Sequence, residues 1–180
     1  MNPAHLHLIL NHFPPIGVPI GLVILLVGLM RHNETLVRTA LVLFVALAAI
    51  TVPVHMTGEP AEEIVEGLAG VSGQAIEAHE DAAFIGLLTT AALGAGSLIA
   101  LLAMRQRRPV ARALGYGIVA LAVVSAGTLT WVANLGGEIR HSEIRSGAPP
   151  SGKTAKPRET QDDSQKSGRV WGGGEHDERE

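Results

Sequence analysis

Four long runs of apolar residues constrain this chain more than any other feature of its sequence. Between Leu41 and Thr57 there is no charged residue at all. A helix of about 20 apolar residues crosses a hydrocarbon core about 30 Å thick, and each run reaches that length once its flanks are counted. The sequence therefore predicts an all-α integral membrane protein, a four-helix up-down bundle in contact with the lipid bilayer. The runs cover Phe13–Met30, Leu36–Met56, Ala82–Met104 and Val110–Leu135.

The distribution of arginine predicts how the bundle is oriented. The turn after the first run contains Arg31 and Arg38, and the turn after the third run is also rich in arginine. The connection from Thr57 to Ala78 has no lysine or arginine and several glutamates. Under the positive-inside rule the two short turns are cytoplasmic, so both termini lie outside. For a bacterial inner-membrane protein, the outside is the periplasm.

The outer connection and the C-terminus differ from the spans. Glu59 and Pro60 are typical of a helix start, and apolar residues on one edge predict a short interfacial helix that ends at Gly70. Ser72 is then placed to cap the third spanning helix. From Ser146 onward the chain is polar and charged, which predicts a disordered tail, residues 146–180, after a bundle of residues 1–145.

Composition excludes several classes of function. The chain has no cysteine, which rules out disulfides, zinc ribbons, iron–sulfur clusters and thioether-linked c-type haem. The net charge of −3 gives no reason to expect a nucleic-acid partner.

Histidine carries the most functional information. Six of the eight histidines fall at the outer ends of the predicted helices, so every span brings at least one to the same face. In an up-down bundle the first and third helices are diagonal, as are the second and fourth. We therefore expect two cross-bundle pairs, His12 with His79 and His55 with His141. The six outer histidines are His5, His7, His12, His55, His79 and His141.

Three interpretations of this cluster remain open at the level of sequence. The first is haem b with two axial imidazoles from opposed helices, which would face each other across about 4 Å of Fe–N bonds, and with Arg140 and Arg145 on the propionates. The second is a non-haem metal held by His12, His55, His79 and His141 with Glu138, which stands three residues before His141. The third is a structural cluster without any cofactor, in which these side chains only join the helices.

Several motifs resemble those of a family of small, largely uncharacterised four-span bacterial membrane proteins. The motifs are His-Leu-Ile-Leu-Asn-His-Phe-Pro at 7–14, Thr-Gly-Glu-Pro-Ala-Glu-Glu at 57–63, Glu-Ala-His-Glu at 77–80 and Gly-Gly-Glu-Ile-Arg-His-Ser-Glu-Ile at 136–144. Similar four-span domains are in some cases fused to c-type cytochrome modules, so the resemblance implies a redox setting. In that wider set a histidine often precedes the Gly-Gly pair, and here the position holds Asn134.

From these observations we expect a membrane redox component that relays electrons on the periplasmic side. A haem near one face cannot carry electrons across the bilayer alone, so we expect a partner, either a periplasmic cytochrome or a respiratory complex. The protein is then an electron-transfer or accessory subunit rather than a stand-alone enzyme. The alternatives are a non-haem metal protein and a cofactor-free structural or assembly protein.

Overall fold

The computed structural model describes residues 2–66, 68, 71–106 and 112–141, all within one compact unit. In these residues the only regular elements are helices. The predicted tail, Arg145 and Gly70 lie outside the described residues. The elements are α1 (Pro3–Leu10), α2 (Phe13–Met30), α3 (Glu34–Met56), α4 (Gly58–Val65), α5 (Gly73–Arg105) and α6 (Arg112–Arg140).

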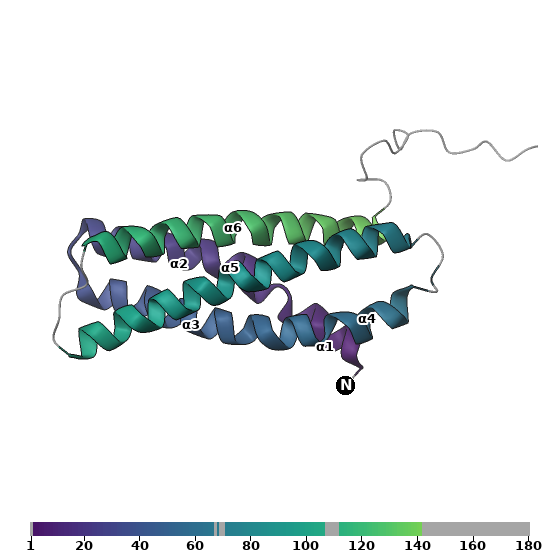
Figure 1. The fold of residues 1–180 in the computed structure, drawn as a ribbon, viewed down its shortest axis with the longest axis horizontal. Helices are drawn as coiled ribbons and strands as arrows, with labels where there is room; N and C mark the ends of the chain where they lie inside the picture. Colours follow the sequence, from purple (N-terminus) through teal and green to yellow (C-terminus); the bar gives the residue numbers. More distant parts are fainter. Residues whose placement is uncertain (1, 67, 69–70, 107–111, 142–180) are drawn as a thin grey trace, which may run out of the picture. The chain divides into compact units, whose positions relative to one another are not determined.

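The four apolar runs are confirmed as four long helices, α2, α3, α5 and α6 (Figure 1). Each is long and apolar enough to cross a membrane, and α1 extends the first of them. Helix α3 packs against α2 and α5, while α6 packs against α5 and α2. Many large apolar side chains, including Ile20, Val23 and Ile99, are exposed on the outside of this bundle, which is compatible with contact with lipid.

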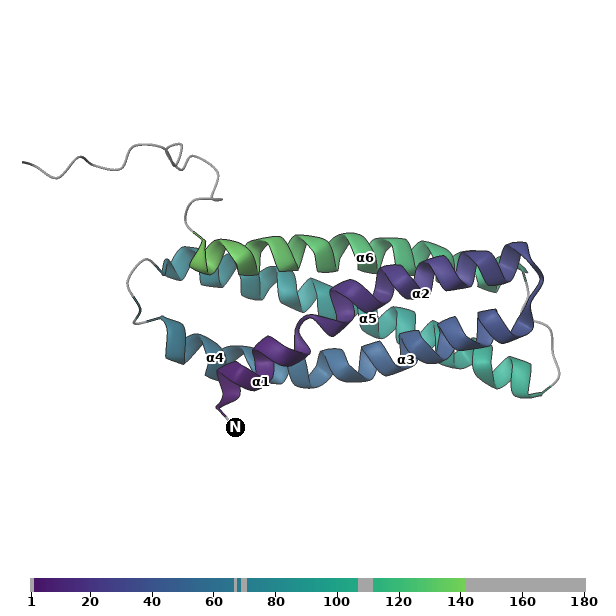
Figure 2. The ribbon, with the colours of Figure 1, turned by 180° about the vertical axis from the view of Figure 1, so that it is seen from behind.

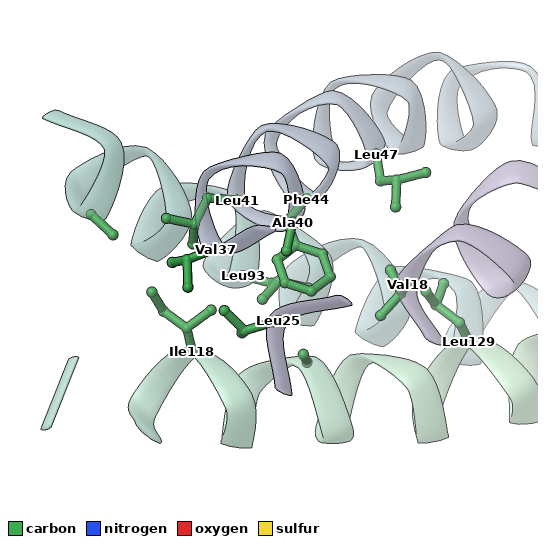
Figure 3. Packing of buried hydrophobic residues seen from close by; sticks show 12 residues of the cluster. Val18, Leu25, Val37, Ala40, Leu41, Phe44, Leu47, Leu93, Ile118 and Leu129 are labelled. Carbon is green, nitrogen blue, oxygen red and sulfur yellow. The ribbon is translucent and has the colours of Figure 1, made fainter. Parts of the chain in front are cut away.

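Side-chain size determines how closely the helices approach. A Cβ at Gly21 would overlap the Phe44 ring, so glycine lets the aromatic side chain of α3 lie against α2. In the same way Gly94 of α5 lies against Ala48 of α3. Figure 3 shows Phe44 in the interior among Leu25, Leu93 and other aliphatic side chains. Close approach through glycine and alanine is the usual packing mode of helices in membranes.

Helix α1 was not predicted from the sequence. Asn2 is its N-cap and accepts a hydrogen bond from the backbone N–H of Ala4, and Pro3 occupies the first turn. The helix stops at Leu10 because Pro14 and Pro15 lack the N–H groups that would continue it, while both fit the first turn of α2. Asn-Pro at residues 2–3 was the sequence signal for this helix.

The short helix of the outer connection exists as α4, but it is shorter than predicted. It ends at Val65, and Ser72 stands at the N-cap of α5 without a capping hydrogen bond from its side chain. Figures 1 and 2 show α1, α4, the first turns of α5 and the last turns of α6 at one end of the bundle. We call this the histidine end.

Candidate functional site

His79 is the best anchored of the predicted ligands. It lies on the second turn of α5, and its Nδ1 is 3.1 Å from the backbone carbonyl oxygen of Val132 on α6. A carbonyl only accepts, so the ring donates from Nδ1, and Nε2 is then the acceptor nitrogen of the neutral imidazole. The ring also lies against Gly136, where a Cβ would stand 3.0 Å from its Cε1. Glycine at 136 is therefore what allows the imidazole to reach α6.

His7 of α1 is held in the same way on the other side of the histidine end. Its Nδ1 is 3.0 Å from the carbonyl oxygen of Val54, and 3.3 Å from Thr57 Oγ1. Val54 belongs to the last turn of α3, where carbonyl groups lack a backbone N–H partner within their own helix, and its carbonyl oxygen also lies 3.0 Å from Thr57 Oγ1 at the C-cap. His7 thus caps α3 with Nδ1, and its Nε2 is left as an acceptor.

His7 and His79 share one arrangement at the histidine end. Each makes its hydrogen bond through Nδ1, and neither Nε2 has a hydrogen bond among the described residues. A histidine that ligates a metal commonly has this arrangement, because a carbonyl bound at one nitrogen orients the other. His7 and His79 are therefore the two histidines at this end whose Nε2 atoms are oriented by a bond from Nδ1 to another helix.

Two carboxyl groups lie beside this pair. Glu62 of α4 and Glu80 of α5 interact with each other. Burial, the interaction with Glu80 and the charges of nearby glutamates together raise the pKa of Glu62 to about 7. At neutral pH the Glu62 carboxyl is therefore partly protonated.

The other two histidines expected in the first three spans lie on the surface. His12 is exposed, and its Nδ1 is 2.7 Å from the carbonyl oxygen of Leu8 in the preceding turn. His55 is exposed and lies against Phe84, with the ring centroids 6.2 Å apart. Through Nδ1, His12 binds its own helix while His79 binds Val132 of α6. The pairing of His12 with His79 and of His55 with His141 remains a prediction.

The predicted residues of the last span remain helical. Helix α6 continues through Gly136 and Gly137, and Asn134 Nδ2 donates to Glu138 Oε1 at 2.8 Å. Arg140 and His141 are exposed at its end. Glu138 and His141 make further interactions, and Arg145 lies beyond the described residues.

A metal site with three or more protein ligands is not found in the part of the chain that the structure describes. No three side chains of His, Cys, Asp or Glu there are grouped so that they could hold a metal ion. The five residues predicted as ligands of a non-haem metal, namely His12, His55, His79, His141 and Glu138, do not form such a group.

No protein-family model matches this chain, and neither a curated protein nor a solved structure is found to be similar to it. The resemblance to the four-span family remains a prediction from the motifs.

His7 is the residue that sequence reasoning missed. It was counted among the outer histidines, but it was not placed in a pair, because the segment before Phe13 was not expected to form a separate helix. The break at Asn11 and His12 is what turns α1 toward α3 and α4, against which it packs. The two prolines after His12 were the available signal for that break.

Proposed function

We propose that this protein is a multi-pass membrane redox component that holds haem b at its histidine end, with His7 and His79 as axial ligands. One observation carries the proposal: at the histidine end, two imidazoles from different helices both have Nδ1 bound to a backbone carbonyl and Nε2 left as an acceptor. In neutral imidazole this is the nitrogen that binds iron.

The donor set favours haem over a non-haem metal ion. A haem needs only two ligands from the protein, because the porphyrin supplies the other four. The described residues offer a pair of imidazoles but no group of three or more ligands. Haem when bound supplies one-electron chemistry, and the hydrogen bonds from Nδ1 make the imidazoles more basic and so tune its potential.

The surroundings of the pair have roles of their own in this proposal. Val132 and Val54 fix the orientation of the two rings through their carbonyl oxygens. Arg140 at the end of α6 is available to a propionate. The prediction from the sequence assigns the same role to Arg145. Because the pKa of Glu62 is raised to about 7, this carboxyl can bind or release a proton when a charge nearby changes.

Membrane insertion and orientation form part of the same proposal. The four long apolar helices support insertion as an up-down bundle, and the arginine-rich turns support a cytoplasmic position for the end opposite the histidines. In a bacterial inner membrane the histidine end and both termini then face the periplasm. The haem would exchange electrons there with a periplasmic cytochrome or with a respiratory complex.

A cofactor-free structural role is the second candidate. The same two hydrogen bonds join α1 to α3 and α5 to α6, and this is all that a role in assembly requires. The two candidate functions differ in the role of Nε2 of His7 and His79. In the haem protein this atom binds iron, and in the structural protein it is not required.

The experiment is an absorption spectrum, oxidised and dithionite-reduced, of protein purified in mild detergent from haem-supplemented cells. The proposal expects a Soret band with sharp reduced α and β bands. His79→Asn and His7→Asn each keep a donor near the Nδ1 position but delete Nε2, so each should lose the spectrum while the protein remains folded. His12→Asn and His55→Asn are the matched controls, and both should keep the spectrum.

A colourless wild-type protein, shown to be folded by circular dichroism, would reject the haem and leave the structural role. Loss of the spectrum in His12→Asn with retention in His7→Asn would instead restore the pair expected from the sequence.

A further inference from the structure

Three hydroxyl groups in the interior of the bundle have no hydrogen-bond partner among the described residues. They belong to Thr90 and Ser97 on α5 and to Ser125 on α6, and all three side chains are completely buried. A buried hydroxyl without a partner costs free energy, and more so where the surroundings are apolar.

These three differ from the other hydroxyls of the long helices. Thr51 and Thr130 each donate to a backbone carbonyl four residues earlier in their own helix. Thr89 and Thr128 lie within hydrogen-bond distance of each other and of a carbonyl three residues earlier, so one of them donates to the other and the second donates to its carbonyl. The bond to the helix's own carbonyl is open to any serine or threonine in a helix, and it needs no outside partner. Thr90, Ser97 and Ser125 do not make it.

The register of α5 and α6 places the three hydroxyls in order along the bundle. Thr89 Oγ1 and Thr128 Oγ1 are 3.0 Å apart, and this bond aligns the two antiparallel helices. At a rise of about 1.5 Å per residue, Thr90 lies about 1.5 Å beyond that bond, Ser125 about 4.5 Å and Ser97 about 12 Å, all away from the histidine end. The steps between successive hydroxyls are thus about 3 Å and about 7.5 Å along the axis.

We propose that a short file of bound water occupies the interior of the bundle between α5 and α6 and bridges Thr90, Ser125 and Ser97. In this proposal one water bridges Thr90 and Ser125, and two more bridge Ser125 and Ser97. A buried water typically makes about three hydrogen bonds to polar groups that lack other partners.

The chemistry of the lining favours water over a cation. The three groups are neutral hydroxyls that both donate and accept, which suits a neutral ligand of the same kind. The buried residues near them on both helices, including Leu93, Gly94, Ala122 and Leu129, are apolar and carry no charge. A cation in this place would have no counter-charge beside it.

The test is infrared difference spectroscopy of the O–D stretch in the purified full chain, with exchange between D₂O and D₂¹⁸O. Internal water gives sharp bands that shift with the heavier oxygen, and hydroxyl groups of the protein do not shift. Wild type should show such bands, and Ser125→Ala and Thr90→Val should lose or displace them. Thr130 is exposed and donates to the carbonyl of Ala126 in its own helix, so Thr130→Val should leave the bands unchanged.

A melting temperature measured on the same samples shows whether each variant is folded. If wild type shows no ¹⁸O-sensitive band and Ser125→Ala melts at a higher temperature than wild type, no water is bound to the three hydroxyls and the proposal is overturned. A band or melting temperature that depends on sodium but not on potassium or choline would overturn it in favour of a cation.

Discussion

Alanine at Gly136 should conflict with His79, and the size of that conflict can be worked out from the structure. The new Cβ would stand 3.0 Å from Cε1 and 3.3 Å from Nδ1 of the His79 ring. Both distances are shorter than ordinary contacts between these atoms, so the ring must move by a few tenths of an ångström. The hydrogen bond from Nδ1 to Val132 is already 3.1 Å long, and the movement stretches it further.

Two opposing terms set the expected stability of Gly136→Ala. Alanine stabilises a helix by up to about 1 kcal/mol relative to glycine. Loss of the His79 hydrogen bond costs about 1 kcal/mol. The variant should therefore unfold with nearly the wild-type free energy. In a His79→Ala background the conflict is gone, and the same substitution should be stabilising.

The assay is reversible unfolding in mixed micelles with increasing denaturing detergent, followed by circular dichroism. The double-mutant cycle of Gly136→Ala and His79→Ala should give a coupling energy of about 1 kcal/mol. Gly127→Ala, where an added Cβ meets nothing within 4 Å, is the matched control and should show no coupling to His79. A coupling near zero at Gly136 would refute the packing of His79 on α6.

Three further predictions concern the core, the carboxyl pair and the hydroxyl bond. Phe44→Ala should lower the free energy of unfolding by about 3 kcal/mol, because the ring is completely buried. Val42→Ala, on the exposed face of the same helix, is the control and should change that free energy little. The unfolding assay described above measures both variants. The folded-state pKa of Glu62 is raised to about 7 from its ordinary value of 4.5, so its contribution to stability is fully present below about pH 4.5 and is lost as the pH rises through about 7. Hydrogen exchange of α4 should accordingly be slower at pH 5.5 than at pH 8 after correction for the intrinsic rate, and Glu62→Gln should abolish that difference; an equal difference in the variant would contradict it. Thr89→Val should cost about 0.6 kcal/mol through loss of the bond to Thr128, and a cycle with Thr128→Val that shows no coupling would reject that bond.

The fold was largely predictable because its strongest determinant is local. Runs of about 20 apolar residues form helices wherever water cannot satisfy the backbone, and the first run coincides with α2 at both ends. Helix ends depend on weaker signals. Asn33 caps α3 through a bond to Leu36 N, as its residue type suggests, but Ser72 occupies the equivalent position of α5 without making that bond.

The pairing of histidines was less accessible to sequence reasoning. Straight helices of an up-down bundle put His12 opposite His79, and this argument has no place for a break at residues 11 and 12. With the break, α1 packs against α3 and α4, and His7 binds the carbonyl of Val54 on α3. The direction that α1 takes after the break is set by its packing against α3 and α4, and such tertiary contacts cannot be predicted from the sequence around residues 11 and 12.

The choice of histidine at positions 7 and 79 is itself an argument about function. Each ring uses Nδ1 to donate to a carbonyl of another helix, and an asparagine amide could donate at nearly the same place. A purely structural requirement is therefore met by a smaller side chain that has no second ring nitrogen. What histidine adds at both positions is Nε2, a nitrogen that accepts a proton or binds a metal near neutral pH. In the proposed function, two such atoms from different helices at the histidine end are the ligands of the haem, and the asparagine variants remove these atoms while keeping the hydrogen bonds between the helices.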